Sequence, residues 1–176
     1  MTGAVDAVKA LLLVFFAGLL QVSIVAPIEV AGGSPDVLLV TLVGVALLRG
    51  PVYGALCGFF AGLIVDTATL ETLGLTSLVL TVAGYWIGRY GETTGRDRSH
   101  APLLSVVVIT LLYSLGVLAL HFMIGDAVSA GHVLIETMPP AIAFNVLLTI
   151  PIYALCARLL RQSPPPGRVP EVQLLG

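Results

Sequence analysis

The chain alternates between long apolar stretches and short segments that hold its glycine, proline and charged residues. Six mostly apolar stretches recur, at residues 8–25, 36–48, 52–65, 73–87, 102–122 and 140–160. Inside a bilayer a chain must satisfy its own backbone hydrogen bonds, so an apolar run of this kind predicts a membrane-spanning helix. The pattern therefore predicts an all-α integral membrane protein. Its six transmembrane helices form a single domain over residues 1–161.

The second and third stretches are shorter than a bilayer requires. They contain 13 and 14 residues. That is about 20 Å of helix, against a hydrocarbon core about 30 Å thick. Either flanking polar residues enter the bilayer, or these helices lie behind the others, or the pair is a re-entrant hairpin entering from outside. A hairpin would leave Arg49 in the membrane at a cost of about 2.5–3.5 kcal/mol, so we favour two short crossings.

The distribution of charge fixes the predicted orientation. Hydrophobic residues make up 57% of the chain and charged residues 10%, and this excludes an ordinary soluble domain, in which about 25% are charged. Basic residues near span ends stay in the cytoplasm. The basic residues occur only in the two terminal flanks and in the second and fourth loops: Lys9, Arg49, Arg89, Arg96, Arg98, Arg158, Arg161 and Arg168. The other loops carry only acids: Glu29, Asp36, Asp66, Glu71, Asp126 and Glu136. Both termini are therefore predicted to be cytoplasmic.

The remaining composition offers little chemistry. Residues 162–176 contain four prolines and predict a disordered cytoplasmic tail. Cys57 and Cys156 lie inside predicted spans and do not have the spacing of metal ligands. No combination of nucleophile, base and acid suggests catalysis, and no basic patch suggests nucleic-acid binding. We expect a protein without enzymatic activity and without a metal or cofactor.

The most specific local pattern is a ladder of glycines. Gly50, Gly54, Gly58 and Gly62 recur at every fourth residue, and Asp66 takes the next position. On a helix these residues share one face, and small residues on such a face allow a second helix to approach closely. The second helix can belong to the same bundle or to a partner protein. The sequence alone leaves both possibilities open.

A few polar residues at or near the predicted spans are candidates for a functional site. Asp66 and Glu71 flank a short outer connection, and Asp66 either acts inside the membrane or caps the next helix. Asp36 directly follows a proline and suits a cap for the second span. Gln21 and Asn145 are expected to hydrogen-bond between helices, with a ligand-binding role as the alternative.

Several of these motifs together resemble a known family. They are Pro35-Asp36-Val-Leu-Leu-Val, Leu48-Arg49-Gly50-Pro51, the glycine ladder ending in Asp66, Leu73-Gly74-Leu-Thr-Ser-Leu, and Val82-Ala-Gly84-Tyr85. In order and spacing they are similar to the rod shape-determining MreD family, over roughly residues 11–161. Asp36, Arg49 and Asp66 are the polar residues of the matching motifs.

The resemblance implies a non-enzymatic scaffold in the bacterial cytoplasmic (inner) membrane. Members of this family bind MreC, a single-span protein, within the cell elongation complex. They work with the glycosyltransferase RodA, a class B penicillin-binding protein and MreB, so that peptidoglycan synthesis supports a rod-shaped cell. The ladder Gly50–Gly62, or another apolar face, would then receive a partner helix, and the remaining surface would contact membrane lipids.

The resemblance also suggests an alternative function. The architecture of the family is similar to the substrate-binding subunit of energy-coupling factor transporters, which take up vitamins. Such a subunit would have a pocket that opens outward near Asp66, Glu71 and Asn145. The sequence holds no dense cluster of aromatic and polar residues to recognise a vitamin, and Trp86 lies where an interfacial anchor is expected. We therefore favour the scaffold.

Overall fold

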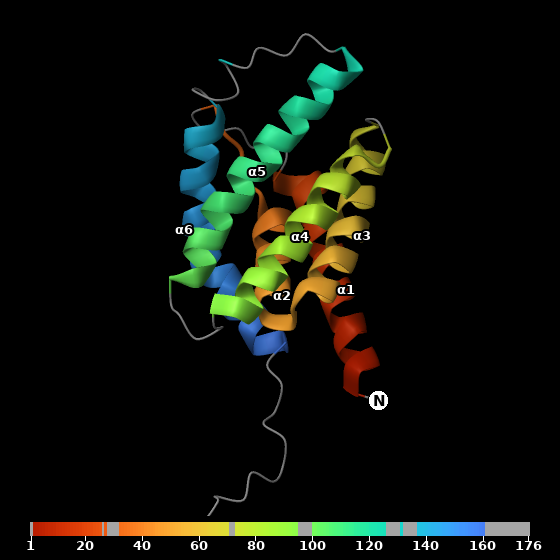
Figure 1. The fold of residues 1–176 in the computed structure, drawn as a ribbon, viewed down its shortest axis with the longest axis vertical. Helices are drawn as coiled ribbons and strands as arrows, with labels where there is room; N and C mark the ends of the chain where they lie inside the picture. Colours follow the sequence, from red (N-terminus) through yellow and green to blue (C-terminus); the bar gives the residue numbers. More distant parts are fainter. Residues whose placement is uncertain are drawn as a thin grey trace, which may run out of the picture.

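The computed structural model describes residues 2–25, 27, 32–70, 73–94, 100–125, 131 and 137–160. These residues fold almost entirely into helices (Figure 1). Helix α1 is continued by a short π-helical segment, Gln21–Val25, and five helices follow it. The α-helices are α1 (Thr2–Leu20), α2 (Val37–Arg49), α3 (Pro51–Thr69), α4 (Leu75–Thr94), α5 (Ala101–Ile124) and α6 (Met138–Leu160). Glu71, most of the long outer loop and the proline-rich tail lie outside the described residues.

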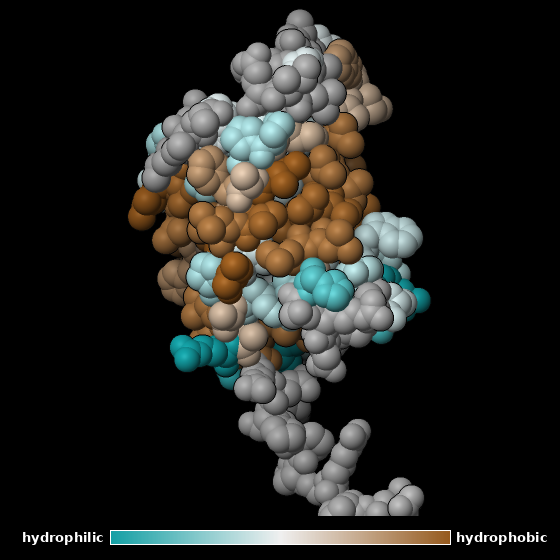
Figure 2. Space-filling view, turned by 90° about the vertical axis from the view of Figure 1, so that its left-hand side faces the viewer, coloured by the Kyte–Doolittle hydropathy of each residue, from teal (hydrophilic) through white to brown (hydrophobic). Residues whose placement is uncertain are grey.

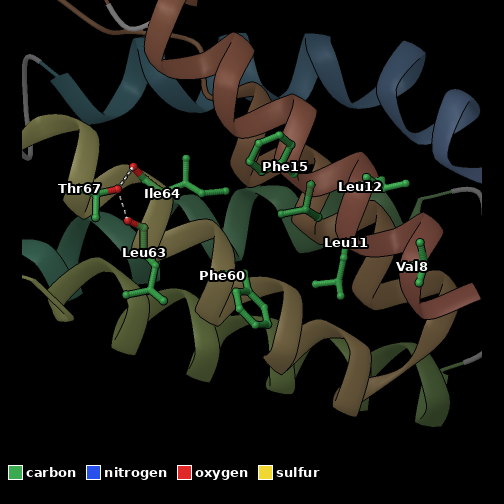
Figure 3. A pocket seen from close by; sticks show the side chains of 9 residues that line it. Val8, Leu11, Leu12, Phe15, Phe60, Leu63, Ile64 and Thr67 are labelled. Atoms are coloured by element: carbon green, nitrogen blue, oxygen red, sulfur yellow. Dashed lines mark hydrogen bonds between the residues drawn. The ribbon is translucent and has the colours of Figure 1, made fainter. Parts of the chain in front are cut away.

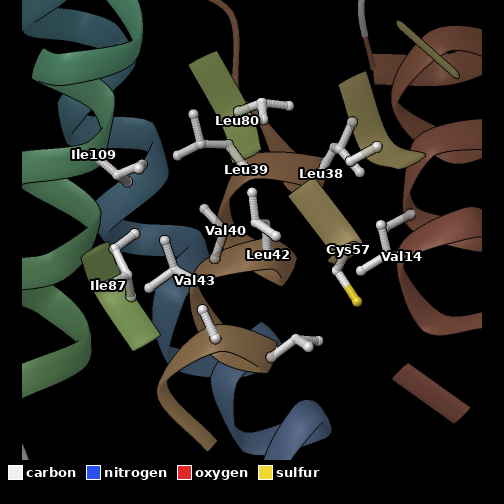
Figure 4. Close-up of a cluster of buried hydrophobic side chains, with 14 of the residues drawn as sticks. Val14, Leu38, Leu39, Val40, Leu42, Val43, Cys57, Leu80, Ile87 and Ile109 are labelled. Atoms are coloured by element: carbon white, nitrogen blue, oxygen red, sulfur yellow. The ribbon is translucent and has the colours of Figure 1, made fainter. Parts of the chain in front are cut away.

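Helix α2 forms the centre of the bundle. Residues 38–47 are all buried, and the other five α-helices contact α2. A helix that is apolar on every side can be satisfied only when other elements surround it. Figure 4 shows the result, with Leu39, Leu42 and Val43 of α2 among side chains from the neighbouring helices. Of the arrangements that its short length allowed, α2 adopts the one in which it lies behind the others.

The outer helices present apolar side chains outward. Phe16, Phe60, Trp86 and Leu147 are each more than 40% exposed, and the face drawn in Figure 2 carries a wide hydrophobic band. Three helical segments are long and apolar enough to cross a membrane: Val5–Val25, Pro51–Thr69 and Met138–Leu160. Two shorter apolar helices, Val37–Arg49 and Ala101–Gly116, accompany them. The chain is thus a helical membrane protein.

The predicted end of the third span, at residue 65, was wrong. Helix α3 has 19 residues and runs past Asp66 to Thr69. The prediction stopped at the first charged residue, but this carboxylate is buried against the next helix. The hydroxyl of Thr67 donates to the carbonyl of Leu63 at 2.7 Å, so polar side chains continue the helix without needing water. Helix α4 likewise extends beyond the predicted end at residue 87, to Thr94.

Candidate functional site

The glycine ladder lies against α4 of the same chain. A Cβ atom built on Gly54 would collide with the carbonyl oxygen of Gly84, and one on Gly58 would collide with the carbonyl oxygen of Leu80. At Gly62 it would meet the backbone of Ser77. The two backbones approach this closely only because glycine has no side chain.

The ladder is therefore an internal seam between α3 and α4. These two helices make the most extensive contact of any pair in the described part of the chain. Gly50, at the start of α3, completes the seam against Gly88 of α4. Packing within the bundle is the arrangement found here, and a partner helix could reach this face only if α4 moved away.

Asp66 closes the outer end of the seam. Its carboxylate accepts hydrogen bonds from the backbone N–H groups of Gly74, Thr76 and Ser77, at 2.8, 3.2 and 3.4 Å. These N–H groups stand at the first turn of α4, where no carbonyl of the helix itself can pair with them. A carboxylate also suits the positive end of the helix dipole. Asp66 is 1% exposed, and it acts as the cap of α4.

A second polar junction fixes the start of α2. Asp36 caps this helix, since its side chain accepts from the N–H of Leu39 at 2.8 Å. Gln21 bridges two backbone groups of the same segment. Its Oε1 accepts from the N–H of Val37 at 2.8 Å, and its Nε2 donates to the carbonyl of Pro35 at 3.1 Å. The π-helical end of α1 is thereby held to the start of α2.

Asn145 of α6 extends this junction to two further helices. Its Oδ1 accepts from the backbone N–H of Asp36 at 2.8 Å, and its Nδ2 donates to the hydroxyl of Thr110 at 3.1 Å. Thr110 in turn donates to the carbonyl of Val106 within α5. Asn145 is 1% exposed. The junction joins α1, α2, α5 and α6, so the expectation of hydrogen bonding between helices describes what Gln21 and Asn145 do.

An ion pair lies at the opposite end of α2. Arg49 donates from Nη1 to Oδ2 of Asp6 at 2.6 Å, and the side chains are 5% and 18% exposed. The pair joins the start of α1 to the end of α2 across 43 positions of sequence. Asp6 was not among the candidate residues predicted from the sequence. The single signal available for this pairing was the presence of opposite charges on the same predicted side.

The residues expected around an outward pocket fall into separate groups. Asp66 belongs to the seam between α3 and α4, whereas Asn145 belongs to the junction at α2. Neither residue lines any of four well-formed grooves among the described residues. Both residues use their polar atoms to hold helices together.

The accessible hollows lie on the outer surface. A groove of about 520 Å³ runs between α1 and α3 (Figure 3). Apart from the hydroxyl of Thr67, which is bonded within α3, its side chains are apolar. It is lined by Val8, Leu11, Leu12, Val14 and Phe15 of α1 and by Phe60, Leu63, Ile64 and Thr67 of α3. No local sequence motif predicts this groove, because its residues come from helices that are far apart in the sequence. We call it the α1–α3 groove.

These features define a helical membrane protein whose described polar residues mostly serve internal packing and whose outer surface is apolar and grooved. The chain belongs to the MreD family, because the family model described as rod shape-determining protein MreD matches residues 4–162. This confirms the resemblance found in the sequence and implies a role in determining rod shape. The chain matches no curated protein and no solved structure.

Proposed function

We propose that the chain is a non-enzymatic scaffold of the bacterial cell elongation complex in the cytoplasmic membrane. It crosses the membrane six times with both termini inside, in a fold similar to the substrate-binding subunits of energy-coupling factor transporters. It binds an MreC-like single-span protein and supports peptidoglycan synthesis by RodA and a class B penicillin-binding protein, together with MreB. The observation that carries the proposal is the α1–α3 groove, which is apolar, faces outward and runs along two membrane-capable helices.

The α1–α3 groove replaces the glycine ladder as the proposed docking face. Val8, Leu12 and Phe15 follow one another at helical spacing along α1, opposite Phe60 and Ile64 of α3. In lipid, two helices associate through close packing and interhelical hydrogen bonds, since lipid tails already solvate apolar side chains. A partner helix with small residues on one side would fill the groove and bury Phe60, which is 46% exposed.

Two adjacent phenylalanines allow a matched test of the docking face. Phe60 lines the groove, whereas Phe59 lines none of the four grooves and is similarly exposed, at 44%. Truncating a side chain that anchors an interface costs more than about 1 kcal/mol, or about fivefold in affinity, and we propose Phe60 as such an anchor. We expect Phe60→Ala to lower recovery of an MreC-like protein with the tagged chain by at least that factor, with Phe59→Ala near wild type. Equal recovery with both variants would refute this location.

The transporter alternative predicts a different outcome from the same purification. A substrate-binding subunit would retain a vitamin in stoichiometric amount, with ATPase subunits in place of the wall synthases. Asp66 and Asn145 already have hydrogen-bond partners within the bundle, and this favours the scaffold. Rods that become round on depletion of the chain would support the scaffold, and unchanged rods would count against it.

A further inference from the structure

A second groove lies on the other side of α1. It has a volume of about 640 Å³ and runs between α1 and α6, with α2 as its floor. Leu12, Leu13, Phe16, Ala17 and Leu20 of α1 face Ile152, Leu155, Cys156 and Leu159 of α6 across it, over Val37 and Thr41. The hydroxyl of Thr41 donates to the carbonyl of Val37 at 2.7 Å. The channel between the two walls is therefore apolar. We call it the α1–α6 groove.

One end of the α1–α6 groove is basic. Lys9 and Arg158 both line it, and both are exposed. Helix α1 starts at the end of the bundle where α6 finishes (Figure 1), so the two side chains stand at the same mouth. Neither has an ion-pair partner in the part of the chain that the structure describes. Asp6, one turn before Lys9, interacts with both Lys9 and Arg49. Its single negative charge is thus set against Arg49 as well as Lys9, and together with Arg158 the mouth carries a net positive charge.

The lining of the groove ends, on α1, next to the polar junction at Gln21. The last lining residue on α1 is Leu20, and directly after it Gln21 bonds to Pro35 and Val37. From Lys9 to Leu20 the helix rises about 16 Å. This is close to half of a hydrocarbon core of about 30 Å. The groove thus extends through about one leaflet and stops, which suits acyl chains and is too short for a helix that crosses the whole membrane.

We propose that the α1–α6 groove binds an anionic phospholipid, with its phosphate at Lys9 and Arg158 and an acyl chain along the apolar floor. Basic pockets between helices on the cytoplasmic side suit acidic head groups. The assignment to the cytoplasmic leaflet rests on the proposed topology, whereas the binding itself does not depend on any partner. The site also differs from the α1–α3 groove proposed for the partner helix.

The test measures lipid binding to the purified full-length chain by native mass spectrometry. Phosphatidylglycerol and phosphatidylcholine of equal chain length are titrated separately. We expect phosphatidylglycerol to bind more tightly. We also expect the double variant Lys9→Gln with Arg158→Gln to lose about 25-fold in affinity for it, since each basic residue contributes about fivefold. Binding of phosphatidylcholine should change little. Arg89→Gln is the control, because Arg89 is exposed on α4, pairs with Glu92 and does not line the groove.

A second variant tests the apolar part of the site. Leu155→Trp, in the wall of the groove, should lower the binding of both lipids. Ile150→Trp, also exposed on α6 (66%, against 52% for Leu155) but outside the four grooves, should not. Thermal unfolding of each variant confirms that the bundle is intact. Equal affinity for the two lipids, an equal loss with Arg89→Gln, or crosslinking of a partner helix from position 155 would each overturn the proposal.

Discussion

The seam between α3 and α4 makes a quantitative prediction at Gly58. In Gly58→Ala the new methyl group meets the carbonyl of Leu80, a backbone atom that cannot swing away, so the two helices must separate. Overpacking of this kind costs about 1–3 kcal/mol. Alanine has a higher helix propensity than glycine, and this difference stabilises the variant by about 1 kcal/mol. Because the obstacle is backbone, we take the upper part of the overpacking range, about 2–3 kcal/mol. After subtracting the gain in helix propensity, we expect the free energy of unfolding to fall by about 1–2 kcal/mol.

Two other helical glycines provide matched controls for this prediction. A Cβ at Gly18 meets Cγ2 of Ile64 at 3.2 Å, and one at Gly116 meets Cγ1 of Val79 at 3.1 Å. Both contacts are with methyl groups of β-branched side chains and need a shift of only a few tenths of an ångström, whereas the contact at Gly58 is a collision with backbone. We therefore expect Gly18→Ala and Gly116→Ala to cost clearly less than Gly58→Ala. Unfolding in detergent by a denaturant titration measures all three variants. If Gly58→Ala unfolds at the same denaturant concentration as the two controls, the seam is not a close backbone contact.

Two further predictions concern the polar junctions. Asp66→Ala leaves three N–H groups at the start of α4 without their acceptor, and we expect a loss of about 1–2 kcal/mol in the same unfolding titration. Asp66→Asn keeps one acceptor and should fall between this variant and wild type. Asn145→Leu removes the hydrogen bond between α6 and the start of α2, and we expect the free energy of unfolding to fall by about 0.6–2 kcal/mol. Faster hydrogen exchange at the N–H of Asp36 in that variant would show that the loss is local, and unchanged exchange would contradict the assignment.

The sequence predicted those features that depend on neighbouring residues. A proline followed by Asp36 and an apolar run predicts a helix cap, and Asp36 does cap α2. The ladder of small residues predicts close helix packing, which α3 and α4 show. It could not say which helix would pack there, because a small-residue face accepts any helix of suitable shape. Gly84, which meets Gly54, lies four residues before Gly88 and so has the same spacing as the ladder, but this spacing does not show that the two sets of glycines face one another.

Features that join distant segments could not be predicted in this way. The partners of Arg49 and Asn145 depend on how the helices pack around α2, and no local sequence feature predicts that packing. The end of α3 was placed too early for a related reason. A carboxylate at residue 66 suggests a loop when it is considered alone, but it becomes an internal cap once α4 lies beside it.

The arrangement of the two grooves around α1 leads to a last prediction. Both grooves depend on apolar shape along α1, which forms a wall of each, and the α1–α6 groove has a basic mouth in addition. Leu12 lines both of them and is 50% exposed, so its substitution should leave the core unaffected. We expect Leu12→Trp to lower recovery of the partner protein and binding of phosphatidylglycerol together. Phe60→Ala should lower only the first and Leu155→Trp only the second. A Leu12→Trp variant with both properties unchanged would show that neither groove is occupied along α1.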